Sequence, residues 1–226
     1  MYDFVRGPLF WASAIICIAG LIYRSVKLLR LTQKKEIVLC PVTISPKDKP
    51  APAISAEERK LDRIARFQNS VIGQHPVMVA VSTVFHVCLF ASPLLLLAHN
   101  VMLSSAIGIR LPAIPDGLAD LMTIFVLAGA FFFLIRRIAV PKVAAISSAY
   151  DYGVLFLTLM PFLTGFLAYH QLFHYKSVLT LHILTGDILL IALPFTKIGH
   201  MVFFFFSRLH IAGEYCLGRG SRTWNT

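Results

Sequence analysis

The sequence predicts an all-α membrane protein with five transmembrane helices, and three observations lead to that fold class. The mean hydropathy is +0.74 and only 14% of the residues are charged, against about 25% in ordinary soluble domains. Five apolar stretches approach or exceed the ~20 helical residues that cross a hydrocarbon core. No stretch alternates in the way that is typical of a barrel strand. Helices are therefore expected, because lipid offers backbone groups no outside partner.

The five predicted spans belong to a single domain that covers residues 1–226. The first is short, and no strongly basic segment precedes it, so we interpret it as a retained span and not as a cleaved signal peptide. The predicted spans are 8–23, 76–99, 118–135, 151–170 and 178–206.

Lysine and arginine are distributed unevenly between the two sides of these spans, and this predicts the orientation. Residues 24–70 carry eleven of them, the link after the third span three, and the C-terminal tail three. The other side carries only Arg6, Arg110 and Lys176. The N-terminus is therefore expected in the periplasm and the C-terminus in the cytoplasm, in a multi-pass protein of the inner membrane with a cytoplasmic link at 24–75.

The cytoplasmic link contains a candidate amphipathic helix. Leu61, Ile64 and Phe67 recur at three-residue spacing among charged residues. Such a helix is either solvated or lies against the membrane surface or a partner subunit. The sequence leaves both interpretations open.

Composition and motifs exclude several kinds of function. The formal charge of +10 is too unevenly spread to suggest nucleic-acid binding, and no RNA-binding or zinc-finger pattern is present. The four cysteines stand far apart and form no C-x-x-C pair, so neither a zinc site nor an iron–sulfur site is visible. Cys17 and Cys88 fall in apolar runs and are expected to be small core residues.

The fifth span carries two histidines, His182 and His200, in a segment that is otherwise almost entirely apolar. A buried imidazole needs a partner for each ring nitrogen, and hydrocarbon offers none. Eighteen residues at about 100° each make a whole number of helical turns. We therefore expect both rings to face the same way, roughly 27 Å apart along the axis, with one in each leaflet.

Second ligands would come from another helix, and the second span offers His75, His86 and His99. His75 and His86 lie about 20° from a common face. His86 and His99 lie about 140° apart on an ideal helix, which Pro93 can kink. Axial separation favours the second pair, at ~20 Å, so spacing alone leaves the choice open.

Four histidines in two intramembrane pairs favour bis-histidine haem b. Such a group needs only axial nitrogens and an apolar slot between helices. Zinc or non-haem iron would normally use carboxylates or thiolates, which are scarce here. The competing interpretation is that single histidines form hydrogen bonds between helices, in a haem-free membrane scaffold or transporter subunit.

Three stretches resemble the gamma subunit of respiratory nitrate reductase, a five-span di-haem cytochrome b. They look most like its relatives of the Tmc and Dsr types, in the membrane redox complexes of sulfate-reducing bacteria. The resemblance implies two b haems, each with one ligand from span two and one from span five. The stretches are STVFHVCLF in span two, LIRRIAVPKVAAISSAYDY after span three, and LHILTGDILLIALPFTKIGHMV in span five.

The resemblance also implies how the ligands pair. His86 would hold the inner haem with His200, and His99 would hold the outer haem with His182. The family's second ligand in span two would fall at Leu96, which cannot ligate, and His99 is the nearest replacement. The rival scheme pairs His75 with His200, and His86 with His182.

By this resemblance the chain is an electron-transfer subunit of a respiratory redox complex and not a whole enzyme. It would carry electrons between menaquinone or a periplasmic multihaem cytochrome c and a cytoplasmic iron–sulfur subunit, as in sulfate respiration. Whether it has its own quinone-reducing or quinol-oxidising site is left open.

Charged residues near the expected haems are further candidates. Lys197 and the Arg136–Arg137 pair are candidates to neutralise haem propionates or to dock a partner on the cytoplasmic side, and the alternative is that they only follow the positive-inside rule. The candidates for a quinone site near the outer haem are Arg110, His99, Asp187 and His170.

Overall fold

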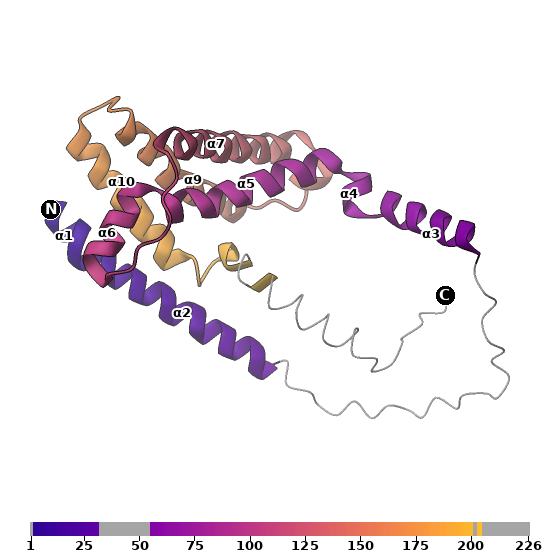
Figure 1. Ribbon diagram of the computed structural model, residues 1–226, viewed down its shortest axis with the longest axis horizontal. Helices are drawn as coiled ribbons and strands as arrows, with labels where there is room; N and C mark the ends of the chain where they lie inside the picture. The colour runs from indigo at the N-terminus through magenta and orange to yellow at the C-terminus, as the bar shows by residue number, and fades with distance from the viewer. Residues whose placement is uncertain (1, 32–54, 201–202, 205–226) are drawn as a thin grey trace. The chain divides into compact units, whose positions relative to one another are not determined.

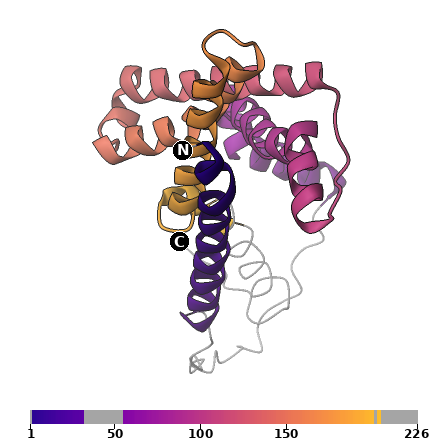
Figure 2. The ribbon, with the colours of Figure 1, turned by 90° about the vertical axis from the view of Figure 1, so that its left-hand side faces the viewer.

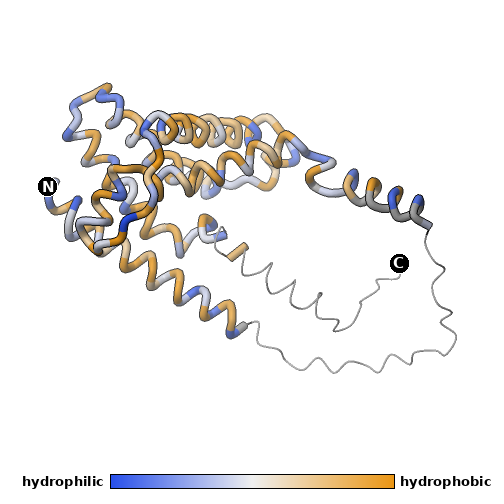
Figure 3. The backbone as a smooth tube through the Cα atoms, in the orientation of Figure 1, coloured by the Kyte–Doolittle hydropathy of each residue, from blue (hydrophilic) through white to orange (hydrophobic). Residues whose placement is uncertain are grey.

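The structure is a computed structural model that describes residues 2–31, 55–200 and 203–204. Within these ranges the chain is helical and has no strand, and five helices are long and apolar enough to cross a membrane. Figure 3 shows apolar residues along all five. The predicted all-α, multi-pass fold class is confirmed. The five spans are Tyr2–Arg30, Pro76–Leu95, Asp116–Ala139, Ala149–Tyr169 and Tyr175–Ala192.

The first, third and fourth spans match the predicted ones apart from their ends. The first runs through α1 (Tyr2–Phe4), the short π-helix η1 (Val5–Leu9) and α2 (Phe10–Leu31), so it is longer than the predicted 8–23. The third is α7 (Asp116–Ala139) and the fourth is α9 (Ala149–Tyr169). The short α8 (Pro141–Ala144) connects them.

The second span ends earlier than predicted. The helix α5 (Pro76–Leu95) stops where Leu96 adopts an extended conformation, with ψ of 130°, and α6 (Leu97–Ile107) begins at the next residue. Pro93 lies two residues before the end of α5, and a proline removes a donor from the helical hydrogen-bond ladder. His99 therefore lies on α6 and not on the spanning helix that carries His86.

The fifth span is also interrupted, whereas 178–206 was predicted as one helix. The helix α10 (Tyr175–Ala192) ends before Pro194, a turn follows, and the short 3₁₀ helix η2 (Lys197–Gly199) precedes His200. Proline is common just after a helix end because it cannot continue the helix. His182 and His200 thus lie on different elements, and the argument that eighteen residues place them on one face does not hold.

The chain divides into two compact units, each with its own packing. One comprises Met1–Gln33 and Leu134–Thr226, in which α10 packs against α9 and against α2 (Figures 1 and 2). Gly20 lets α2 approach the chain just after α10 closely. A Cβ atom at Gly20 would lie 2.7 Å from Cγ of Pro194, and Nη1 of Arg24 donates a 2.6 Å hydrogen bond to the carbonyl of Pro194.

The other unit is Lys34–Phe133. In it Phe85 of α5 packs against α7, where a Cβ atom at Gly129 would lie 2.8 Å from the Phe85 ring. The rings of Phe85 and Phe133 meet edge to face, with centroids 5.2 Å apart. The carbonyl of Leu95, at the end of α5, accepts a 3.0 Å hydrogen bond from the amide of Ile114. The unit also holds α3 (Ala56–Gln68) and α4 (Val71–Gln74).

Three smaller predictions can be compared with the structure. Cys17 and Cys88 are buried free cysteines, as predicted for core residues. On α3 the side chains of Leu61, Ile64 and Phe67 are all exposed, which leaves both interpretations of this helix open. The basic tail and most of the proline-rich part of the link lie outside the described residues.

Candidate functional site

The four histidines predicted as ligands share one local arrangement. In each, Nδ1 of the ring lies within hydrogen-bond distance of a backbone carbonyl oxygen. The distances are 2.7 Å from His86 to Ser82, 2.8 Å from His99 to Pro93, 2.9 Å from His182 to Pro161, and 2.7 Å from His200 to Lys197.

This arrangement fixes the tautomer of each neutral ring. A carbonyl oxygen only accepts hydrogen bonds, so Nδ1 must carry the proton. Nε2 is then the nitrogen with the lone pair, which is the atom that coordinates a metal. Metal-ligating histidines almost always donate their other N–H to a carbonyl, carboxylate or water, which orients the ring and raises its basicity. The donor set therefore fits axial ligation of haem iron.

The ring of His86 is oriented by its own helix. Its acceptor, Ser82, lies one turn earlier on α5, and the Ser82 hydroxyl is 3.4 Å from the same Nδ1. The ring of Phe85 meets that of His86 edge to face, with centroids 5.3 Å apart. Because Phe85 is itself buried against Gly129, this part of α5 is held by packing as well as by hydrogen bonds.

His99 depends on the break between α5 and α6. Carbonyls in the last turn of a helix have no intrahelical donor. The carbonyl of Pro93 lies in that turn of α5, and it accepts the hydrogen bond from Nδ1 of His99. The break that shortens the second span thus also supplies the acceptor that orients this ring.

His182 lies on α10 but is positioned by α9. Its Nδ1 donates to the Pro161 carbonyl, and the hydroxyl of the buried Thr164 is 3.5 Å from the same nitrogen. A Cβ atom at Gly165 would lie 3.0 Å from Cε1 and 3.1 Å from Nδ1 of His182. The ring thus occupies the space that a side chain at Gly165 would fill.

These supporting residues on α9 were not predicted from the sequence. The only signal for them is a proline, a threonine and a glycine within five residues of an apolar helix, in the stretch PFLTG. Such residues are common in membrane helices and permit close packing. Sequence alone does not show that they face a histidine on the next helix.

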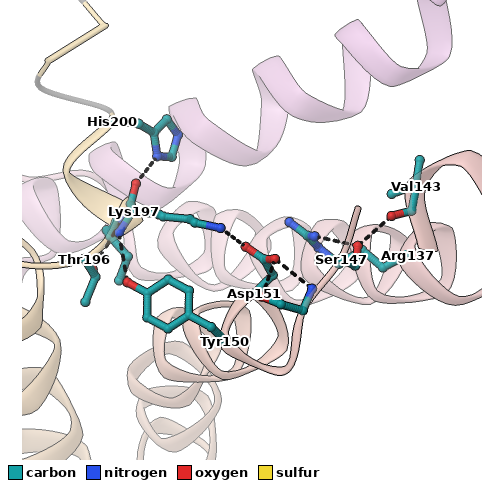
Figure 4. A network of polar contacts seen from close by, with 10 residues as sticks. Arg137, Val143, Ser147, Tyr150, Asp151, Thr196, Lys197 and His200 are labelled. Carbon is teal, nitrogen blue, oxygen red and sulfur yellow. Dashed lines mark hydrogen bonds and ion pairs between the residues drawn. The ribbon is translucent and has the colours of Figure 1, made fainter. Parts of the chain in front are cut away.

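His200 is positioned through Lys197, which uses three of its groups (Figure 4). The Lys197 carbonyl accepts from Nδ1 of His200, and the Lys197 amide donates to the hydroxyl of Tyr150 over 3.3 Å. Nζ of Lys197 forms a 2.7 Å ion pair with Asp151. The turn that carries His200 is therefore tied to the first residues of α9.

The beginning of α9 is itself fixed by local bonds. Asp151 accepts hydrogen bonds of 2.9 Å from both the amide and the hydroxyl of Ser148, in a capping box. Arg137 donates a 3.0 Å hydrogen bond to the hydroxyl of Ser147 (Figure 4). Lys197 thus already has an anionic partner, although its side chain is 64% exposed and an ammonium group has three donors.

The other sequence candidates are placed differently. His75 is the N-cap residue of α5, where its side chain makes no capping hydrogen bond. Nδ1 of His174 lies 3.0 Å from the hydroxyl of Ser177, which can donate or accept. The exposed Arg110 donates a 3.1 Å hydrogen bond from Nε to the hydroxyl of Ser104. His210 lies outside the described residues.

The candidate ligands fall into two pairs by unit. His86 and His99 belong to the unit Lys34–Phe133, and His182 and His200 belong to the other. The pairing of rings across the two units stays a prediction. Among the described residues, no group of three or more His, Cys, Asp or Glu side chains could hold a metal ion.

One known protein is similar to this chain over almost its full length. A protein of Nitratidesulfovibrio vulgaris (strain Hildenborough) is 35% identical over 227 residues, which cover 99% of this chain and 97% of that protein. Its recorded name, "Protein", states no activity. No family model matches the chain, and no solved structure matches it. Because the similarity spans almost the whole of both proteins, this chain belongs to the same family as the Nitratidesulfovibrio vulgaris protein.

Proposed function

We propose that this chain is the membrane-anchoring di-haem b subunit of a respiratory redox complex. It would carry electrons across the inner membrane between menaquinone or a periplasmic multihaem cytochrome c and a cytoplasmic iron–sulfur subunit. The N-terminus would be periplasmic and the C-terminus cytoplasmic, in a bundle like that of the nitrate reductase gamma subunit. One observation carries the proposal: Nδ1 of each candidate ligand donates to a backbone carbonyl, in His86, His99, His182 and His200.

That observation favours ligation over a purely structural role. A coordinating imidazole carries its proton on the ring nitrogen that does not face the metal. All four rings meet this requirement, because each donates from Nδ1 to a backbone carbonyl. The four acceptors come from four different local structures, so a common sequence motif does not explain the agreement.

The ligand pairing that we favour is His86 with His200 and His99 with His182. The bond from His99 to the Pro93 carbonyl supports His99 as the second ligand of this unit. Bound haem would supply reversible one-electron chemistry at a potential tuned by axial ligands and burial.

The protein's own residues would position those ligands and shape the site. Pro161, Thr164 and Gly165 hold the ring of His182, and Lys197 holds the ring of His200. Lys197 already pairs with Asp151, so a haem propionate would be its second anionic partner. Arg110, exposed and bonded to Ser104, remains our candidate for a quinone or propionate contact on the periplasmic side.

Partners follow from what the chain can supply. The four cysteines of the sequence stand far apart and form no C-x-x-C pair, so an iron–sulfur cluster would reside on another subunit. The exposed face of α3 with Leu61, Ile64 and Phe67 is a candidate surface for docking that cytoplasmic subunit.

The test is the absorption spectrum of the protein purified from membranes. Dithionite should produce the sharp band of a reduced b-type cytochrome, and a quinol analogue should produce the same band if the chain accepts electrons from quinol. A colourless protein would contradict the proposal and favour a haem-free membrane scaffold or transporter subunit. Haem reduction by dithionite but not by quinol would limit the chain to electron conduction between partner proteins.

A further inference from the structure

A carboxyl group lies buried where the first and last spans meet. Asp187 of α10 is 1% exposed and Ser13 of α2 is fully buried. Oδ1 of Asp187 lies 2.9 Å from Oγ of Ser13, and that Oγ also lies 2.8 Å from the carbonyl oxygen of Phe10. The second carboxyl oxygen, Oδ2, is buried and has no hydrogen-bond partner in the described part of the chain.

The number of donors decides the protonation state. A serine hydroxyl has one proton, and the Phe10 carbonyl can only accept. If Asp187 were ionised, it too could only accept, and one hydroxyl proton would have to serve two acceptors. If Asp187 is protonated, Oδ1–H donates to Ser13, and Ser13 donates to Phe10. Every close contact then has its own proton.

Burial points the same way. An ionised carboxylate in an apolar environment is far more costly than a neutral acid, unless it is paired with a cation and fully hydrogen-bonded. In the neutral acid the unpartnered Oδ2 is an ordinary carbonyl oxygen. In the ionised carboxylate, Oδ2 would carry half of a negative charge and would have no hydrogen-bond donor.

No cation compensates that charge in the described residues. The structure gives Asp187 one polar partner, Ser13. Arg24, which lies on the same helix as Ser13, donates to the Pro194 carbonyl, beyond the end of α10. The other titratable groups on α10 and on the elements packed against it do not bond to Asp187, whose one partner is Ser13. They are Tyr175, Lys176 and His182 of α10, Arg6 of η1, Cys17, Tyr23, Arg24, Lys27 and Arg30 of α2, and Tyr150, Asp151, Tyr152 and Tyr169 of α9.

We infer that Asp187 is a neutral carboxylic acid that donates its proton to Ser13, so that the contact between α2 and α10 is a proton-binding site within the membrane. The inference does not depend on haem. Release of the proton would require Ser13 to turn from Phe10 to Asp187, and it would leave Oδ2 charged without a donor. Deprotonation is therefore coupled to the packing of α2 on α10, which must admit water or separate.

Infrared spectroscopy of the purified protein in detergent at neutral pH tests this directly. The wild type should show the C=O stretching band of a protonated carboxylic acid, and this band should shift to lower wavenumber in D₂O. Asp187→Asn should lose the band, and its amide can still donate to Ser13, so the fold should be kept. Asp116→Asn, which removes an exposed carboxyl group at the start of α7, should leave the band unchanged.

A second variant keeps the test decisive if Asp187→Asn does not fold. Ser13→Ala removes the acceptor of the Asp187 proton, so the same C=O band should move to higher wavenumber. A wild-type spectrum without an acid band that depends on Asp187 would overturn the inference. An acid band that is lost in Asp187→Asn but does not move in Ser13→Ala would overturn the assigned hydrogen bond.

Discussion

Gly165 offers a sharp test of how His182 is held. A Cβ atom at this position would lie 3.0 Å from Cε1 and 3.1 Å from Nδ1 of His182, whereas ordinary contacts begin at 3.4 Å. In Gly165→Ala the ring must therefore move by about 0.4 Å away from α9. The same movement stretches the 2.9 Å bond from Nδ1 to the Pro161 carbonyl past the usual range of about 2.7–3.2 Å.

The expected cost follows from these two effects. Overpacking typically costs about 1–3 kcal/mol, and a weakened hydrogen bond adds up to about 1 kcal/mol. Replacing glycine by alanine in a helix gains ~1 kcal/mol. Gly153 lies on the same helix and has nothing within 4 Å of its Cβ position. Gly153→Ala should therefore gain helix stability without overpacking.

The assay is thermal unfolding of both variants in the same detergent. Gly165→Ala should be less stable than Gly153→Ala by about 1–4 kcal/mol. At roughly 2–4 °C per kcal/mol for a chain of this size, the difference in Tm should be readily measured. If His182 is a haem ligand, Gly165→Ala should also lose haem more easily than Gly153→Ala. Equal Tm values for the two variants would refute the close contact between Gly165 and His182.

Two further substitutions test the packing of the unit that holds α2, α9 and α10. Gly20→Ala should lower the free energy of unfolding by about 1–3 kcal/mol, because the added Cβ atom overpacks against Pro194. Gly7→Ala is the control, because a Cβ atom there has nothing within 4 Å. Equal melting temperatures for the two variants would contradict this prediction. Ser148→Ala should cost about 0.5–2 kcal/mol by removing the cap of α9, measured in the same melts, and an unchanged Tm would show that the capping box contributes nothing to stability.

Hydropathy was sufficient to predict the helical class and the five spans. Apolar runs of the required length leave few alternatives in a bilayer, and the spans at α7 and α9 agree with prediction to within a few residues at each end. The buried positions of Cys17 and Cys88 followed for the same reason. The orientation of the spans, the haems and the partner subunits stay predictions.

Local backbone geometry could not be predicted in the same way. Pro93 was expected to kink the second span, but the helix breaks at Leu96, three residues later. Pro194 was read as part of a continuous fifth span, but it follows the end of α10. In both cases an apolar window hides the helix end, because hydropathy does not register backbone conformation or hydrogen bonding.

The acceptors of the four histidines were hidden for a related reason. All four are backbone carbonyls, and a carbonyl is present at every position of the sequence. Only the fold determines which carbonyls a ring can reach, as Pro161 on α9 shows for His182. The sequence could therefore name the histidines as candidate ligands, whereas it could not show the bonds that fix their tautomers.

The haem content per chain tests the central claim most directly. It is measured from the pyridine haemochrome spectrum and the protein concentration of each purified variant. We expect two haems in the wild type, one in His99→Ala, and two in both His75→Ala and His174→Ala. A wild type without haem, or haem lost from His75→Ala but kept in His99→Ala, would contradict the account.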